Sequence, residues 1–273
     1  EQFFSSVYPT ISSGKTTKVM IVSTPHGMNM FYKLWVDAEE GRNTYIPIEV
    51  HWSEVPGRDD KWKEETIKNT SQAQFNTEFE CEFLGSIDTL ISPHKLKQLT
   101  YRSPKQSSGG LDVHIPPQAD HTYLLTADVS RGTSNDYSAF VVVDVSEIPY
   151  RVVAKFRDNE IKPLIFPSKI YDTARAYNQA FVLIEVNDIG EQVANAMQFD
   201  LEYDNLIMAS MRGRAGQVLG CSNLKQLVED NKLIIEDYEC INELSTFIVK
   251  GASFEADDGC NDDLVACLFI FAW

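Results

Sequence analysis

The sequence predicts a mixed α/β protein, in which a sheet of three antiparallel strands plus parallel strands is flanked by helices. Three apolar runs, at 122–129, 138–145 and 150–157, follow one another with short turns between them, as in an antiparallel meander. A helix that begins at Pro167 and an all-apolar strand at 181–187 come next. Because a helical crossover normally returns the chain parallel in the same sheet, the meander is predicted to gain a parallel neighbour.

The remainder of this larger domain is predicted from its apolar periodicity and its turn residues. In chain order we expect a helix at 189–200, a strand at 205–210, a helical stretch at 222–235, a helix or a helix followed by a strand at 239–250, and an apolar helix at 261–273. In a β-β-β-α-β order the first and fourth strands lie side by side. A closing helix that packs on this sheet would bring its first residues close to both strands.

The residues before the meander are predicted to form a separate α/β segment. In chain order we expect a strand at 18–25, a helix at 28–41 that stops at Gly41, a strand at 45–52, and a polar helix with aromatic anchors at 59–83. Residues 101–120 are rich in Pro, Gly and Ser and lack periodicity, so they are predicted to be a linker. The predicted organisation is therefore 1–100, the linker at 101–120, and a domain at 121–273.

The composition argues against several classes of protein. The five cysteines include no CxxC pair, which argues against a zinc site or a disulfide framework and suits a reducing cytosol. No run of about 18 apolar residues occurs, and the N-terminal residues lack the features of a signal peptide, so neither a membrane span nor export is expected. The net charge of −16 is unusual for a protein that mainly holds nucleic acid, unless basic patches or divalent cations offset it.

Acidic residues occupy three positions where apolar residues would be expected. Asp128 lies within the first strand of the meander, Glu185 lies near the end of the fourth strand, and Asp262 and Asp263 open the last helix. If these elements meet, the carboxylates cannot all ionise without a nearby cation. Oxygen ligands without His or Cys favour Mg²⁺ or Mn²⁺. A pair of such ions catalyses phosphodiester hydrolysis in many enzymes.

A structural interpretation of the same acids stays open. A single Asp in a strand is more often a structural acid than a metal ligand. Asp262 and Asp263 could instead cap the last helix and interact with its dipole. Glu185 is harder to explain in this way, because the run around it is otherwise apolar. The order of the acids, on the first strand, the fourth strand and the last helix, favours a shared site.

Three stretches around these acids resemble the nuclease motifs of the large terminase subunit of tailed bacteriophages, closest to the T-even-like group: TADVSRGTSNDYSAF, LIEVNDIG and DDGCNDDLVACLFIFAW. The resemblance covers essentially the whole chain and implies a ribonuclease-H-like fold. It implies that Asp128, Glu185 and Asp263 are catalytic acids and metal ligands, with Asp136 and Asp262 as further ligands. Asn261 stands where relatives often carry His.

The N-terminal segment resembles the end of the terminase ATPase domain in the stretch VSTPHGMNMFYKLW. The nearby SSGKTT is not a P-loop, because Pro9 stands where that pattern requires Gly and a strand rather than a helix is predicted to follow. No complete Walker A motif and no convincing Walker B motif precede the stretch. The chain is therefore expected to carry the tail of a motor domain and to have no ATPase activity by itself.

The resemblance implies a metal-dependent endonuclease that uses Mg²⁺ or Mn²⁺ in a two-metal site. Such an enzyme would cut double-stranded DNA with little sequence specificity when phage genome packaging starts and ends. Arg212 and Arg214 are expected to contact DNA phosphates. The implied partners are the ATPase portion of the same protein, the portal of the procapsid and the small terminase subunit. The implied location is the cytoplasm of the infected bacterium, at the portal.

Two other functions stay open at this point. The chain could be another ribonuclease-H-like nuclease of the resolvase or transposase type, although such folds have no reason to carry the N-terminal segment. It could also be a non-catalytic module that grips and translocates DNA, in which case the acids would be structural.

Overall fold

The computed structural model describes residues 8–9, 13–14, 16–25, 30–81, 83, 89–130, 137–186, 189–210, 214–251, 253–257 and 259–273. Two compact units make up the chain, Glu1–Gly85 and Ser86–Trp273. Among the helices of the described ranges, none combines the length and the apolar character that crossing a bilayer requires.

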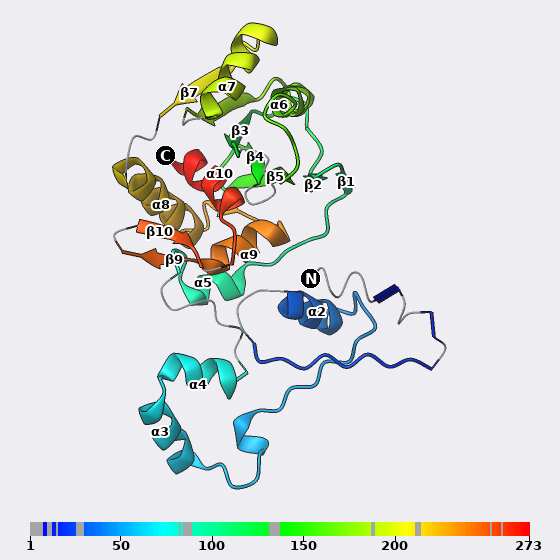
Figure 1. Cartoon of the computed structure of the whole chain (residues 1–273), viewed down its shortest axis with the longest axis vertical. Coiled ribbons are helices and arrows are strands. Elements are labelled where there is room, and N and C mark those ends of the chain that lie inside the picture. Colours follow the sequence, from blue (N-terminus) through cyan, green and yellow to red (C-terminus); the bar gives the residue numbers. More distant parts are fainter. Residues whose placement is uncertain are drawn as a thin grey trace. The chain divides into compact units, whose positions relative to one another are not determined.

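The regular elements in the described part of the first unit are helices, joined by irregular stretches. Its elements are α2 (Met30–Glu39), the 3₁₀ turn η1 (Trp52–Glu54), α3 (Asp60–Asn69) and α4 (Gln72–Glu78) (Figure 1). The single helix predicted at 59–83 is therefore two helices. Ser71 explains the break, because its side chain accepts a hydrogen bond from the backbone N–H of Gln74 and so caps a new helix.

The strands predicted at 18–25 and 45–52 are not present, and this part of the sequence prediction is wrong. Both stretches are irregular in their described residues, apart from the 3₁₀ turn that starts at Trp52. Met20 and Ile46 are 88% and 83% exposed. An apolar alternating stretch becomes a strand only when a neighbouring strand pairs with its backbone and a second layer covers its side chains.

In its described residues, the second unit is built on an eight-stranded mixed sheet. Its strands are β1 (Gln106–Ser108), β2 (Leu111–Val113), β3 (Tyr123–Asp128), β4 (Ser138–Asp144), β5 (Tyr150–Asp158), β6 (Phe181–Glu185), β7 (Leu206–Ala209) and β8 (Leu233–Ile234). The order is β1-β2-β5-β4-β3-β6-β7, with β8 also paired to β5. β3, β4 and β5 are antiparallel, whereas β6 runs parallel to both β3 and β7. The predicted meander and its parallel neighbour are both confirmed.

The segment predicted to be a linker, 101–120, contributes strands β1 and β2 to the sheet. They are joined by a hairpin turn at Gly109 and Gly110, which have φ angles of 53° and 80°. A Cβ at Gly110 would lie 2.9 Å from the carbonyl oxygen of Arg157, so only glycine fits there. The structure divides earlier than the sequence predicts, between Gly85 and Ser86, because the Gly-rich stretch is a hairpin that docks on β5.

Helices cover both faces of this sheet (Figure 1). The unit's remaining elements are α5 (Pro93–Gln98), α6 (Phe166–Ala176), α7 (Gly190–Asn195), the π-helical turn η2 (Ala196–Asp200), α8 (Arg214–Glu229), α9 (Tyr238–Thr246), the hairpin of β9 (Phe247–Lys250) and β10 (Ser253–Ala256), and α10 (Asp263–Ala272). One face packs on α6 and α7 through residues such as Leu125 and Ala127. On the opposite face, Thr126 Oγ1 donates a hydrogen bond to the carbonyl oxygen of Cys267 in α10, 2.8 Å away.

Helix α10 is held tightly between the sheet and α8. Gly220 of α8 faces the backbone of α10, and a Cβ at this position would lie 2.7 Å from the carbonyl oxygen of Phe269. This close approach fixes how far the second half of α10 stands from α8.

We expect the substitution Gly220→Ala to destabilise the protein. Alanine normally stabilises a helix interior by about 1 kcal/mol relative to glycine, but here the added methyl group meets backbone. The expected net loss is about 1–2 kcal/mol, or roughly 2–8 °C in melting temperature by calorimetry. Ser222→Ala, at an exposed position of the same helix, is the control and should change little. An unchanged or raised melting temperature for Gly220→Ala would contradict the tight contact.

Candidate metal centre

Two of the predicted acids lie side by side at the ends of parallel strands. Ala127 of β3 is in register with Ile184 of β6, and the next residues along the two strands are Asp128 and Glu185. Side chains alternate between faces along a strand, so Asp128 lies on the same face as Thr126, the face that α10 covers. Glu185 lies on that face as well, because the preceding residue, Ile184, points to the other face and belongs to the core there.

The same row continues across two more strands. Asp128 is paired with Ala139 of β4, which is paired in turn with Arg157 of β5. Directly opposed residues have Cβ atoms about 4.5–5.5 Å apart and share a face. The row therefore runs Glu185, Asp128, Ala139, Arg157. Ala139 is fully buried and carries only a methyl group, so space above the middle of the row is left for a residue from another element.

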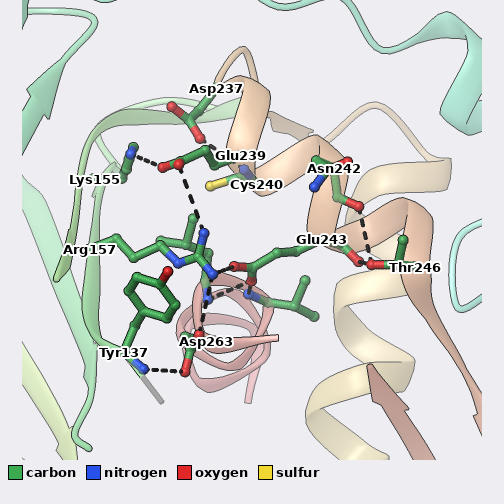
Figure 2. Close-up of polar contacts among 12 residues, drawn as sticks. Tyr137, Lys155, Arg157, Asp237, Glu239, Cys240, Asn242, Glu243, Thr246 and Asp263 are labelled. Carbon is green, nitrogen blue, oxygen red and sulfur yellow. Dashed lines mark hydrogen bonds and ion pairs between the residues drawn. The ribbon is translucent and has the colours of Figure 1, made fainter. Parts of the chain in front are cut away.

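Helix α10 brings Asp263 to this row. Cys267 contacts Thr126 through its carbonyl group, and Asp263 lies one helical turn earlier, on the side where β3 continues to Asp128. Asp263 is 8% exposed. Its Oδ1 accepts a hydrogen bond from the backbone N–H of Tyr137, 3.2 Å away, and its Oδ2 lies 3.6 Å from Arg157 Nη2 (Figure 2).

Burial and the charges of nearby acids both act on Asp128. Removal from water raises the pKa of Asp128 to about 7, and the negative charges of Asp263, Glu185 and Asp262 add to this effect. Burial also raises the pKa of Glu185. Asp128 is therefore within electrostatic reach of the carboxylates on β6 and at the start of α10. A cation placed among them would relieve both their repulsion and their desolvation.

Capping does not explain the acids that open α10. Glu243 of α9 caps this helix instead, because its Oε2 accepts hydrogen bonds from the backbone N–H groups of Leu264 and Val265 at 2.7 and 3.1 Å. Asp262 makes no side-chain cap, and its Oδ2 accepts a hydrogen bond from the N–H of Ala256, 3.1 Å away. The structural interpretation of Asp263 as a helix cap is therefore not supported.

Two charged residues of this site, Arg157 and Glu243, were not predicted from the sequence. Glu243 is 3% exposed, and burial raises its pKa to about 8, although the charge of Arg157 opposes the shift. A signal for Glu243 was present, because it follows Cys240 and precedes Phe247 at helical spacing on an otherwise apolar stripe. Arg157 gave no such signal, since it alternates with Phe156 as an exposed strand residue would.

The chemistry of the site fits a hard divalent cation. Its donors are carboxylate oxygens, and the neighbouring Cys267 is buried, which raises the pKa of its thiol well above the usual value and keeps it protonated. In the described part of the chain, however, no three Asp, Glu, His or Cys side chains form a group arranged to hold a metal ion. Asp136 and Arg212, both predicted site residues, lie outside the described residues, as does the side chain of Arg214.

Family models match both parts of the chain. A model described as the terminase RNaseH-like domain matches residues 125–270. A model described as the N-terminal part of the terminase large subunit of T4likevirus type matches residues 1–98. The terminase large subunits of Thermus virus P23-45 and Thermus phage G20c are 23% and 22% identical over 258 residues. In both cases the match covers 89% of this chain and 51% of the relative, so the chain spans about half of their length.

Solved structures support the same fold. The large terminase nuclease from the thermophilic phage G20c, solved with bound magnesium, matches with a TM-score of 0.59 and 21% identity over 68% of this chain and 96% of that one. The large terminase nuclease domain of Thermus phage P74-26 matches with a TM-score of 0.56 and 23% identity over 67% and 93%. Together with the two family models, these matches show that the chain belongs to the large-terminase family and that its second unit has the family's ribonuclease-H-like fold.

Proposed function

We propose that this chain carries the nuclease of a phage DNA-packaging motor. It would cut double-stranded DNA with little sequence specificity, when packaging starts and when it ends. One observation carries this proposal: the buried Asp128 of β3 lies beside Glu185 of β6 and within electrostatic reach of the acids at the start of α10, on one face of a ribonuclease-H-like sheet. A buried carboxylate with acidic neighbours is costly unless a cation joins them.

Asp128, Glu185 and Asp263 would be the catalytic acids and metal ligands, and Asp262 and Asp136 would complete a site for two Mg²⁺ or Mn²⁺ ions. Bound ions of this type activate a water molecule and stabilise the leaving oxygen of the phosphodiester. The protein's own contribution is positional. The N–H of Tyr137 orients the Asp263 carboxylate, and the register of β3 with β6 sets Asp128 beside Glu185. Structural neighbours solved with bound cobalt, magnesium or zinc support a divalent ion.

The DNA and protein partners follow from the proposed role. Arg212 and Arg214 precede or open α8 in the chain and would contact DNA phosphates. The net charge of −16 predicts weak, salt-sensitive binding, so access to DNA would depend on the ATPase portion, the portal of the procapsid and the small terminase subunit. The place of action would be the cytoplasm of the infected host, at the portal. We expect no ATPase activity from this chain alone.

The alternative role as a non-catalytic DNA-gripping module has one observation in its favour. The described acids do not form a ready ligand group. Asp136 follows β3 in the first acidic motif and lies outside the described residues. The nuclease proposal counts Asp136 as a metal ligand, so its ligand group is larger than the described acids alone. Membership of the large-terminase family argues against the other alternative, a resolvase or transposase.

We predict that the protein nicks and linearises supercoiled plasmid when Mg²⁺ or Mn²⁺ is present at low salt. Asp128→Asn and Asp263→Asn should each lower the cleavage rate by at least about 100-fold, because each removes a proposed metal ligand. Asp172→Asn, at an exposed position on α6, is the matched control and should cut normally. Plasmid that stays intact with the wild-type protein at high concentration would favour the gripping role.

A second prediction separates a metal ligand from a structural acid at Asp128. At pH 8, above its raised pKa of about 7, the buried carboxylate is charged and costs stability in the metal-free protein. Asp128→Asn should therefore raise the free energy of unfolding in EDTA, by up to about 4 kcal/mol. Excess Mn²⁺, at about 100 times its Kd, should stabilise the wild type by about 2.7 kcal/mol and the variant far less.

Calorimetry in EDTA and in Mn²⁺ would measure both effects, with Asp172→Asn as the control. A variant less stable than the wild type in EDTA would mean that Asp128 has a stabilising partner in the fold. In that case Asp128 is a structural acid and the metal-site proposal loses its central ligand.

A further inference from the structure

Arg157 lies where the candidate metal centre meets helix α9. Its side chain is 14% exposed at the end of β5 and faces three carboxylates (Figure 2). Nη2 lies 3.3 Å from Glu243 Oε1 and 3.6 Å from Asp263 Oδ2, and Nη1 lies 3.8 Å from Glu239 Oε1. Glu239 is also paired with Lys155, so part of its charge is offset elsewhere. The closest ion pairs of Arg157 are therefore those with Glu243 and Asp263.

Arg157 reaches the first turn of α10 by two routes. The direct route is its ion pair with Asp263. The indirect route runs through Glu243, whose Oε1 contacts the guanidinium while Oε2 accepts the N–H groups of Leu264 and Val265. One guanidinium nitrogen, Nη2, thus contacts both the Asp263 carboxylate and the residue that caps its helix. Movement of Arg157 would change the position of Asp263 through both routes.

Arg157 also contacts Tyr137, which lies within the first acidic motif. Its guanidinium carbon lies 3.8 Å from the centre of the Tyr137 ring, a stacking contact. The backbone N–H of Tyr137 donates to Oδ1 of Asp263, so the two oxygens of this carboxylate face Tyr137 and Arg157 respectively. Tyr137 and Arg157, which stack on each other, therefore hold the Asp263 carboxylate from both sides.

We propose that Arg157 is a positioning residue, which fixes the orientation of Asp263 for metal binding. This inference rests on the proposed function. A planar guanidinium is suited to the task, because it stacks on Tyr137 with its face while it meets Glu243 and Asp263 at its edge. Lysine would keep the charge but could not make the stacked and forked contacts together. Replacement of a residue that orients a metal ligand in this way typically lowers metal affinity 10- to 100-fold.

The test is a titration with Mn²⁺ alone, with free Mn²⁺ measured by electron paramagnetic resonance. Arg157→Met should weaken Mn²⁺ binding by about 10- to 100-fold. Charge alone predicts the opposite, because removal of a cation close to a cation site would tighten binding. Arg151→Met is the matched control. Arg151 lies on the same strand and is ion-paired with Glu236 at 2.7 Å, and its replacement should leave Mn²⁺ affinity unchanged.

Two more variants separate positioning from stability. Arg157→Met leaves the buried Glu243 without its cation, so it should lower the melting temperature. The double variant Arg157→Met with Glu243→Gln removes that buried charge and keeps an acceptor for the helix cap. We expect it to recover melting temperature while Mn²⁺ binding stays weak. Arg157→Lys, which keeps the charge, should fold and still bind Mn²⁺ about 3- to 10-fold more weakly.

The outcomes distinguish this inference from the proposed function. A wild-type protein that binds no Mn²⁺ would overturn the proposed function and the inference that rests on it. Wild-type binding with unchanged or tighter binding in the folded Arg157 variants would overturn the positioning role alone. If Arg157→Met fails to fold, Arg157→Lys and the double variant decide in the same way.

Discussion

Repulsion among carboxylates that the fold forces together is the constraint on which the site depends. Helix α10 is apolar and buried along most of its length, and its burial against the sheet stabilises the unit. The same packing carries Asp263 to the ends of β3 and β6, where Asp128 and Glu185 already lie. Hydrophobic burial therefore brings like charges together. Arg157 offsets part of this charge from one side, whereas burial, together with the neighbouring carboxylates, raises the pKa of Asp128 to about 7.

The sheet register turns this constraint into a defined geometry. A slip of one residue would move every side chain of a strand to the opposite face. Leu125 and Ala127 prevent such a slip in β3, because both belong to the core under α6 and α7. Their burial on one face leaves Asp128 on the other, opposite Ala139. Apolar packing on the far face of the sheet thus determines where the acids lie, and the small side chain of Ala139 leaves room for α10.

The sequence predicted the elements whose signals are local and missed those that depend on distant partners. The strands at 122–129, 138–145 and 150–157 are apolar runs separated by short turns, and Asp128 and Glu185 stand out because they interrupt apolar runs. The function of Arg157 is invisible in the sequence, because a charged residue at a strand end normally faces water, and its partners lie about 80 to 110 positions away on α9 and α10. The prediction of N-terminal strands was wrong for a related reason. An apolar stretch such as that around Ile46 needs pairing partners that local sequence patterns do not reveal.

The distribution of positive charge bears on how such a site would handle DNA. In the second unit, Lys155 is paired with Asp112 and Glu239, and Arg151 with Glu236. Arg157 is likewise surrounded by carboxylates. Cations engaged in this way stabilise the fold and contribute little attraction to a phosphate backbone. On the proposed function, attraction would come instead from bound metal ions and from the stretch that contains Arg212 and Arg214. With a net charge of −16, such a nuclease would attract DNA weakly and would cut only DNA that the rest of the motor presents to it, which suits an enzyme that must spare the genome during packaging.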